Sequence, residues 1–339
     1  MRVGFNPHKD QQETKFEYFH QVVVPVYIPN FEGYFKDGLK ILEICLQSII
    51  KTSHDKTFIT IVNNGSCIEV KNYLDDLLAK YHIHELVHTQ NIGKLNAILK
   101  AINGANFKLI TITDADVLFL NNWQKATYEV FNTFPKAGVV CPTPSPRSLR
   151  IFTANIYWDL FFSKKLQFSK VKNPAALLNF ARSVGNENFY NQYQLNQYLT
   201  VNTDNCKAVV GAGHFVSTYK KEVFQNLNIT YSNYKLGGDS EGKILDQPVI
   251  TKGLWRLSTE DNFAYHLGNV HETWMDFKIN ELYVEKKLYE FESSPFKKQS
   301  RISNFIINKV FSKFILNKKV FRKFIAWKGL SKDAVENYL

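Results

Sequence analysis

The sequence has few cysteines and no long apolar run, and both absences limit the class of protein. Its four cysteines show neither a Cys-x-x-Cys motif nor the spacing of a disulfide framework. No stretch supplies the ~18 consecutive apolar residues that a membrane-spanning helix needs. The first 21 residues are polar and charged, unlike a signal peptide. With 45% hydrophobic residues in 339, we expect a globular protein that is soluble or peripheral and cytoplasmic.

Acidic residues are absent from the segment 297–332, which contains 11 of the 42 lysines and arginines. The other 31 are balanced by the 31 acidic residues of the chain, so the net charge of +11 comes from this segment. Apolar residues recur within it at helical spacing: Ile307, Phe311, Phe314, Phe321 and Ile325, with Val310, Phe324 and Trp327 beside them. This pattern is typical of a basic amphipathic helix in an anionic membrane interface.

Two other interpretations of the basic segment stay open. A basic patch can bind nucleic acid, but so many apolar residues on the opposite side disfavour that partner. The apolar stripe can also pack on the rest of the chain or on a second copy of it, which would make a homo-oligomer. We expect an anionic membrane surface to be the partner of 297–332, and no nucleic acid.

Strand-like and helix-like segments alternate along the first 141 residues. Apolar runs typical of buried strands cover 21–27, 57–62, 85–88, 107–113 and 137–141, and amphipathic helical patterns separate them. This alternation predicts an α/β fold, with a mainly parallel mixed sheet and helices on both faces. Ligands bind such sheets at the carboxyl ends of the strands.

Two carboxylates, Asp114 and Asp116, follow the apolar run 107–113 directly. Just past the end of a strand, such side chains can converge on one hard cation. Oxygen ligands suit Mg²⁺ or Mn²⁺, whose shell is usually completed by water and substrate phosphates. An Asp-x-Asp alone is weak evidence, because solvated aspartates at a strand end give the same pattern.

The surrounding motifs make the pattern specific. The order and spacing of four motifs resemble the nucleotide-sugar-binding half of family 2 glycosyltransferases, which have the GT-A fold. The resemblance covers about residues 22–131. The motifs are Val24-Pro25-Val26-Tyr27, Val62-Asn63-Asn64-Gly65-Ser66, Asn91-Ile92-Gly93-Lys94-Leu95-Asn96-Ala97 and Thr113-Asp114-Ala115-Asp116.

This resemblance implies roles for individual residues. Pro25, Tyr27, Asn63 and Gly65 would contact the nucleobase and ribose, and Lys94 would lie close to the sugar nucleotide. Asp114 and Asp116 would contact the ribose and a Mn²⁺ or Mg²⁺ ion, with Asp116 as the direct ligand. The family commonly has an aspartate at the position of Asn63, but an asparagine can still bond to the edge of a uracil or thymine.

The second half of the chain contains the candidate general base. In the family, a Glu-Asp pair about twelve residues before a glycine deprotonates the acceptor hydroxyl. Glu241 lies at that distance from Gly253, but Gly242 replaces the aspartate, and Asp239 could compensate. Asp246 is a weaker candidate, because Asp-Gln-Pro is typical of a helix N-cap.

A late histidine completes the set of candidates. His266 is a candidate ligand of the metal or the diphosphate, because a neutral imidazole can bind metal ions. A satisfied core histidine is the alternative. Residues 147–205 are rich in Asn, Gln, Tyr and Phe, and we expect them to face the acceptor or to pack as a lid.

The expected organisation is a GT-A catalytic domain over 1–275 and a helical basic amphipathic extension over 276–339. The domain would comprise a nucleotide-sugar-binding half, 22–141, and an acceptor half, 142–275. We expect metal-dependent, inverting transfer from a nucleoside-diphosphate sugar, with a UDP-sugar favoured. The acceptor would be a surface-glycan or lipid-linked saccharide, and the protein would lie on the inner face of the cell membrane.

Two other functions stay open. A sugar-1-phosphate nucleotidyltransferase has a similar sheet, but the sequence lacks a Gly-rich phosphate loop with Arg and Lys after the first strand. A non-catalytic sugar- or membrane-binding module is the third possibility. Asn63 and Gly242, the two departures from the family pattern, keep it open.

Overall fold

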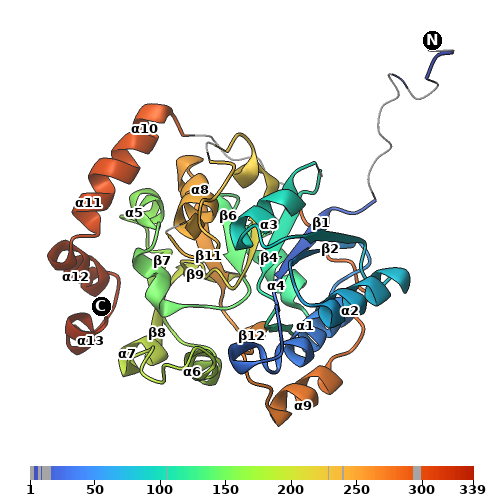
Figure 1. Ribbon diagram of the computed structural model, residues 1–339. Coiled ribbons are helices and arrows are strands. Elements are labelled where there is room, and N and C mark those ends of the chain that lie inside the picture. The colour runs from blue at the N-terminus through green and yellow to red at the C-terminus, as the bar shows by residue number, and fades with distance from the viewer. Residues whose placement is uncertain are drawn as a thin grey trace.

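A central sheet of ten strands forms the middle layer of the molecule (Figure 1). The structure is a computed structural model that describes residues 4–6, 9, 17–104, 106–227, 229–238, 240–292 and 299–339. In their order across the sheet, the strands are β3 (Glu85–Thr89), β2 (Thr57–Asn64), β1 (His20–Val26), β4 (Leu109–Thr113), β10 (Val216–Lys220), β6 (Ala137–Cys141), β11 (Trp255–Thr259), β9 (Lys207–Val210), β8 (Gln197–Asn202) and β7 (Leu166–Lys170). A separate antiparallel pair comprises β5 (Val117–Phe119) and β12 (Ala264–His266).

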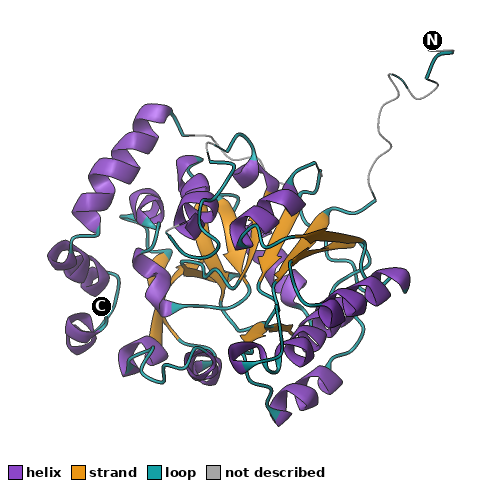
Figure 2. Ribbon diagram, in the orientation of Figure 1, coloured by secondary structure: helices purple, strands orange, loops and turns teal. Residues whose placement is uncertain are grey.

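Helices cover both faces of this sheet, as Figure 2 shows. In the first half these are α1 (Gly38–Thr52), α2 (Ile68–Ala79), α3 (Lys94–Ile102) and α4 (Trp123–Thr133). The second half has α5 (Ala154–Leu160), α6 (Pro174–Ser183), α7 (Gln192–Asn196), η4 (Gly242–Asp246), α8 (Gln247–Thr251) and α9 (Thr273–Glu281). The C-terminal helices are α10 (Arg301–Phe305), η5 (Ile306–Phe311), α11 (Ser312–Ile315), α12 (Lys318–Trp327) and α13 (Lys332–Asn337).

The pairing of the strands is mixed, as the sequence predicts. β1 pairs in parallel with β2 and with β4, and β2 pairs in parallel with β3. β10 enters antiparallel between β4 and β6, and β9, β8 and β7 complete the sheet as an antiparallel meander. The parallel half therefore presents the carboxyl ends of β1, β2 and β4 at one edge, where the motifs of the first half end.

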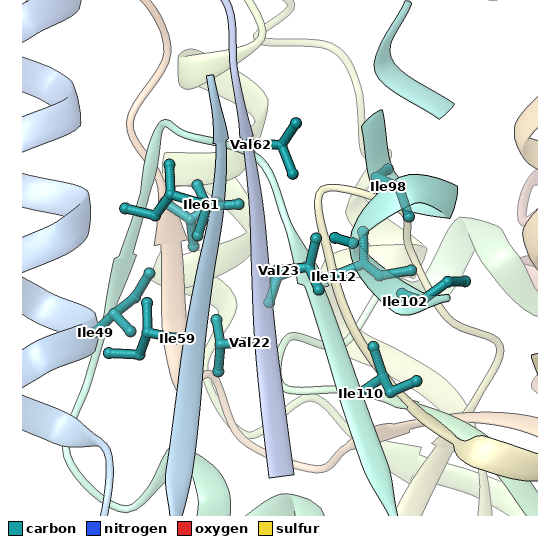
Figure 3. Packing of buried hydrophobic residues seen from close by; sticks show 14 of the residues in the cluster. Val22, Val23, Ile49, Ile59, Ile61, Val62, Ile98, Ile102, Ile110 and Ile112 are labelled. Carbon is teal, nitrogen blue, oxygen red and sulfur yellow. The ribbon is translucent and has the colours of Figure 1, made fainter. Parts of the chain in front are cut away.

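Side chains from both faces of β1, β2 and β4 are buried, which explains why these strands are mainly apolar. Figure 3 shows Val22 on the side of the sheet that faces Ile49 of α1. The next residue, Val23, lies on the opposite side together with Ile98 and Ile102 of α3. Successive side chains of a strand alternate in this way, so a run without polar interruptions indicates two covered faces.

The apolar run 208–216 forms two strands rather than one. β9 ends at Val210, and β10 begins at Val216, so the glycines between them lie in a loop. Gly211 has φ +104°, and a Cβ on it would lie 2.6 Å from Cβ of Ser148. Only a glycine fits this close approach, and the loop carries His214 to the carboxyl edge of the sheet.

Part of the C-terminal stripe is buried against the α/β domain. Phe321, Phe324 and Ile325 of α12 are at most 4% exposed and share a core with Tyr157 of α5. The ring centroids of Tyr157 and Phe324 lie 5.1 Å apart. The predicted boundary after residue 275 falls inside α9, and the division into domains stays a prediction.

No helix within the described ranges is both long enough and apolar enough to cross a membrane.

Candidate active site

A cavity of about 550 Å³ opens at the carboxyl edge of β1 and β4. It is lined by five of the predicted site residues: Pro25, Tyr27, Lys94, Asp114 and Asp116. Tyr34, Asn64, Asn91, Lys235 and Leu236 also line it. Ligand cavities of about 300–1,000 Å³ hold small molecules and cofactors, so a nucleotide fits this volume.

Two predicted nucleotide contacts lie beside this cavity rather than in its lining. Asn63 is 3% exposed, its amide lies 3.0 Å from Nδ1 of His88, and its Oδ1 accepts from the backbone N–H of Ser66. Gly65 has φ +90°, and a Cβ there would lie 2.8 Å from the backbone nitrogen of Asn91. Both residues shape the turn after β2, and a direct contact of either with a nucleotide stays a prediction.

Asn64, rather than Asn63, reaches the cavity from this turn. Its Oδ1 accepts a hydrogen bond from the backbone N–H of Ile92 at 2.9 Å. This bond ties the turn after β2 to the loop that begins α3. Asn63 and Asn64 are successive residues of β2 and their side chains point to opposite faces, so only one of them lines the cavity.

Lys94 lies in the first turn of α3 and joins two carboxylates. Its Nζ is 2.6 Å from Oδ1 of Asp114 and 3.2 Å from Oε1 of Glu241. Burial acts to lower the pKa of Lys94, but attraction to Asp114 and Glu241 outweighs it and raises the pKa. The lysine is therefore a charged part of the site rather than a solvated residue of a helix end.

Asp116 and His266 face each other on the other side of the Asp-x-Asp motif. Oδ2 of Asp116 lies 3.5 Å from Nε2 of His266, and Nδ1 of His266 lies 2.9 Å from Oγ of Ser183. Burial, and then the neighbouring charge of Asp114, raise the pKa of Asp116. Oδ1 of Asp116 is buried and has no hydrogen-bond partner.

These residues fit a metal ion whose other ligands are water molecules and substrate phosphates. Within the described residues, no three or more His, Cys, Asp or Glu side chains are grouped so that they could hold a metal alone. Mg²⁺ is commonly held by one or two carboxylates together with substrate phosphates and water. A buried carboxylate oxygen without a partner is costly, and a cation beside Asp116 would satisfy it.

Sequence analysis missed a network of His214, Asp246 and Arg256, which contacts Glu241 through His214. Nδ1 of His214 lies 3.4 Å from Oε2 of Glu241, and its Nε2 lies 2.7 Å from Oδ2 of Asp246. Asp246 also forms an ion pair with Arg256, and both side chains are 1% exposed. Nη2 of Arg256 donates to the carbonyl of Ala212 at 2.7 Å, which anchors the loop that carries His214.

This network corrects the interpretation of Asp246 as a helix cap. Asp246 does precede α8, but its side chain makes no capping hydrogen bond. It bonds instead to His214 and Arg256. A histidine in the Gly-rich run before β10 and an arginine in the apolar β11 were the available signals, because buried charges are rare unless they are paired.

Glu241 immediately precedes η4 and contacts Lys94 and His214. The other predicted base, Asp239, lies outside the described residues.

A second cavity, of about 300 Å³, is lined in part by His214 and His266. Phe180 of α6, Phe189, Tyr190 and Phe215 contribute to its wall. The rings of Phe180 and Phe215 are stacked at 5.3 Å, and His266 packs edge-on against both. Most of these aromatic residues come from the segment 147–205.

Comparison with known proteins identifies the class of this protein. The mixed sheet and the cavity at its carboxyl edge define an α/β fold of the nucleotide-binding kind. Residues 22–216 match the family described as glycosyl transferase family 2, which is more than half of the chain. The chain therefore belongs to this family of glycosyltransferases, and the predicted GT-A fold is confirmed. None of the curated proteins matches it.

Several solved structures are similar in outline. The mannosyltransferase PcManGT from Pyrobaculum calidifontis, in complex with GDP-Man and Mn²⁺, is 14% identical with a TM-score of 0.44, over 95% of this chain and 76% of that chain. S. aureus TarS 1-349 is 11% identical with a TM-score of 0.43, over 95% and 83%. GalNAc-T7 with UDP, GalNAc and Mn²⁺ is 12% identical with a TM-score of 0.46, over 76% and 45%. Likenesses this distant carry no conclusion about substrates, and the family assignment rests on the sequence match.

Proposed function

We propose that the protein is a metal-dependent, inverting glycosyltransferase that moves a sugar from a nucleoside-diphosphate sugar to a hydroxyl group of a saccharide. The observation that carries the proposal is a row of charged groups: Asp116, Asp114 and Lys94 line one cavity, and Lys94 also contacts Glu241. It joins a candidate cation site to a candidate base across the space where a sugar nucleotide would lie.

Asp116, together with Asp114 and His266, would hold a Mn²⁺ or Mg²⁺ ion. Bound there, the metal would neutralise the charge that develops on the departing diphosphate. The unpartnered Oδ1 of Asp116 is the atom that most needs such a partner. The ammonium group of Lys94 contacts Asp114 directly.

The cavity also suits the nucleoside. Pro25, Tyr27, Tyr34 and Asn64 line it, so a base could stack on an aromatic ring and hydrogen-bond to an amide. A pyrimidine edge is compatible with these groups, which favours a UDP-sugar among the donors.

Glu241 is the proposed base. An inverting displacement forms the bond between the acceptor oxygen and the anomeric carbon while the bond from that carbon to the diphosphate breaks. The acceptor proton passes to a carboxylate. Lys94 and His214 orient the two oxygens of Glu241, and Asp246 with Arg256 orients His214. Asp239 stays an alternative base.

The aromatic cavity beside His214 and His266 is the proposed acceptor site. Sugar rings stack on aromatic side chains, and Phe180, Phe189 and Tyr190 offer such faces next to the candidate base. The acceptor proposed is a surface-glycan or lipid-linked saccharide, reached on the inner face of a membrane.

The test is the release of nucleoside diphosphate from a panel of UDP-, GDP- and dTDP-sugars with Mn²⁺. We expect slow hydrolysis of one donor that falls at least ~100-fold with EDTA and in Asp116→Ala, because charge stabilisation of this kind contributes several kcal/mol. Asp76→Ala, a surface aspartate paired with Lys80 at 2.6 Å, is the matched control. The proposal fails if no donor is hydrolysed and calorimetry detects no binding of any of them.

A further inference from the structure

The exposed face of the helix 301–315 is unusual in composition. α10, η5 and α11 follow one another without a break. Figure 1 shows them as a single long helix along the edge of the molecule. Exposed residues occur along it in adjacent pairs, four residues apart: Arg301 and Ile302, Phe305 and Ile306, Lys309 and Val310, Lys313 and Phe314. One apolar and basic face therefore runs the length of this helix, about 22 Å at 1.5 Å per residue.

This face differs from the stripe that the sequence predicts. Ile307 and Ile315 are at most 1% exposed and pack on the molecule. Phe305 is 62% exposed, and Val310 and Phe314 are 58% exposed. The helical pattern in the sequence contains two apolar faces side by side, and the structure uses only one of them for its core.

A second exposed aromatic pair lies close to the same helix. Phe162 is 86% exposed and Trp327 is 54% exposed, with ring centroids 6.2 Å apart. Phe161 links this pair to the helix, because its ring lies 5.4 Å from Trp327 and 6.3 Å from Phe311. Large exposed aromatic residues in such a group mark interaction surfaces.

The charge of the region has one sign. Residues 299–332 contain no Asp or Glu. Arg322 forms an ion pair with Glu336 at 3.1 Å, and Lys328 is buried on the carbonyls of Phe161 and Ser163. The other basic side chains of this range are exposed: Arg301, Lys309, Lys313, Lys318, Lys319, Lys323 and Lys332.

We propose that the exposed face of the helix 301–315 docks the protein on an anionic lipid bilayer. Phe305, Val310 and Phe314 would enter the boundary between headgroups and acyl chains. Lys309 and Lys313, each next to one of these apolar residues, would reach the lipid phosphates. An interfacial helix needs this combination of apolar area and adjacent positive charge.

Other partners fit the face less well. Pairing of this face with the same face of a second copy would bring like charges together, because three of its four exposed pairs contain a basic residue and none contains an acidic one. A nucleic acid would satisfy the charges but would leave Phe305 and Phe314 against a polar backbone. An anionic bilayer satisfies both kinds of side chain.

The inference rests on the proposed function only in that a membrane-bound protein would meet a lipid-linked acceptor. Docking itself needs neither donor nor metal. It can therefore be tested by sedimentation of the full chain with vesicles of phosphatidylcholine, alone or with 30 mol% phosphatidylglycerol, at low and high salt.

We expect the protein to bind the anionic vesicles and not the neutral ones, and to dissociate from the anionic vesicles as the salt concentration rises. Phe305→Ser/Phe314→Ser and Lys309→Gln/Lys313→Gln should each lower the partition coefficient at least ~tenfold. The matched controls Tyr81→Ser/Phe277→Ser and Lys100→Gln/Lys108→Gln change exposed residues elsewhere, and should bind as wild type does. Unchanged thermal unfolding would show that the variants are folded.

The inference is overturned if the wild-type protein does not bind anionic vesicles or binds neutral ones equally well. It is likewise overturned if the two test variants have the same partition coefficient as the wild type. It is also overturned if sedimentation velocity shows a dimer that Phe305→Ser/Phe314→Ser dissociates. A protein that binds vesicles but releases no nucleoside diphosphate would uphold the docking face and reject the proposed function, so the two failures are distinguishable.

Discussion

Asp246 and Arg256 form a buried ion pair behind the candidate base. A buried ion pair costs desolvation of both partners and is weak evidence for stability. Here the pair holds His214 against Glu241, and Glu241 against Lys94. At the scale of residues, the role of this buried network is to hold the carboxylate of Glu241 in position.

His214 is a positioning residue in this account, and its replacement should affect turnover more than donor binding. Burial and the charge of Arg256 lower the pKa of His214. We expect His214→Gln to lower kcat for nucleoside diphosphate release ~10- to 100-fold. KM for the donor should stay within about twofold, because His214 does not line the donor cavity.

His82→Gln is the control for this substitution, because His82 is exposed. Steady-state kinetics with the best donor of the panel separates kcat from KM. Equal kcat values for the two histidine variants would contradict the role given to His214.

At the scale of elements, the loop between β9 and β10 determines the position of His214. It turns at Gly211, where the carbonyl accepts a hydrogen bond from Oγ of Ser258 at 2.6 Å. The chain then passes Ala212, whose carbonyl is bonded by Arg256. These bonds fix the direction in which His214 leaves the sheet.

Gly211→Ala should therefore destabilise the fold and disturb the site. The new Cβ would lie 2.6 Å from Cβ of Ser148 and 2.7 Å from its carbonyl oxygen, at φ +104°. We expect a loss of more than about 2 kcal/mol in the free energy of unfolding, measured by urea denaturation. Gly104→Ala has a similar φ of +86° with nothing within 4 Å, and should lose only about 1 kcal/mol. Equal losses would show that the contact with Ser148 is unimportant.

The helix 301–315 shows that a helical pattern in the sequence does not predict which apolar residues are buried. A period of 3.6 identifies an amphipathic helix but does not say which of two adjacent apolar faces is covered. Ile307 and Phe314 belong to the same predicted stripe, yet one is buried and the other is exposed. The difference depends on contacts with α5, which is distant in the sequence.

For the whole molecule, the first half was predictable and the network around His214 was not. Apolar runs place β1, β2, β4 and β6 correctly, because both faces of those strands are covered. Local motifs give Asp114 and Asp116. His214, Asp246 and Arg256 come from three separate segments, and no local spacing relates them. Their grouping needs the strand order, in which β10 enters between β4 and β6.

The proposed function depends most on a divalent cation that Asp116 would hold at the diphosphate end of the donor cavity. The most direct measurement is anomalous diffraction at the manganese edge from crystals grown with UDP and Mn²⁺. We predict a single strong peak ~2.0–2.2 Å from Oδ1 of Asp116, absent from crystals of Asp116→Ala. Ordered UDP without a peak beside Asp116, or an unchanged peak in the variant, would contradict the claim.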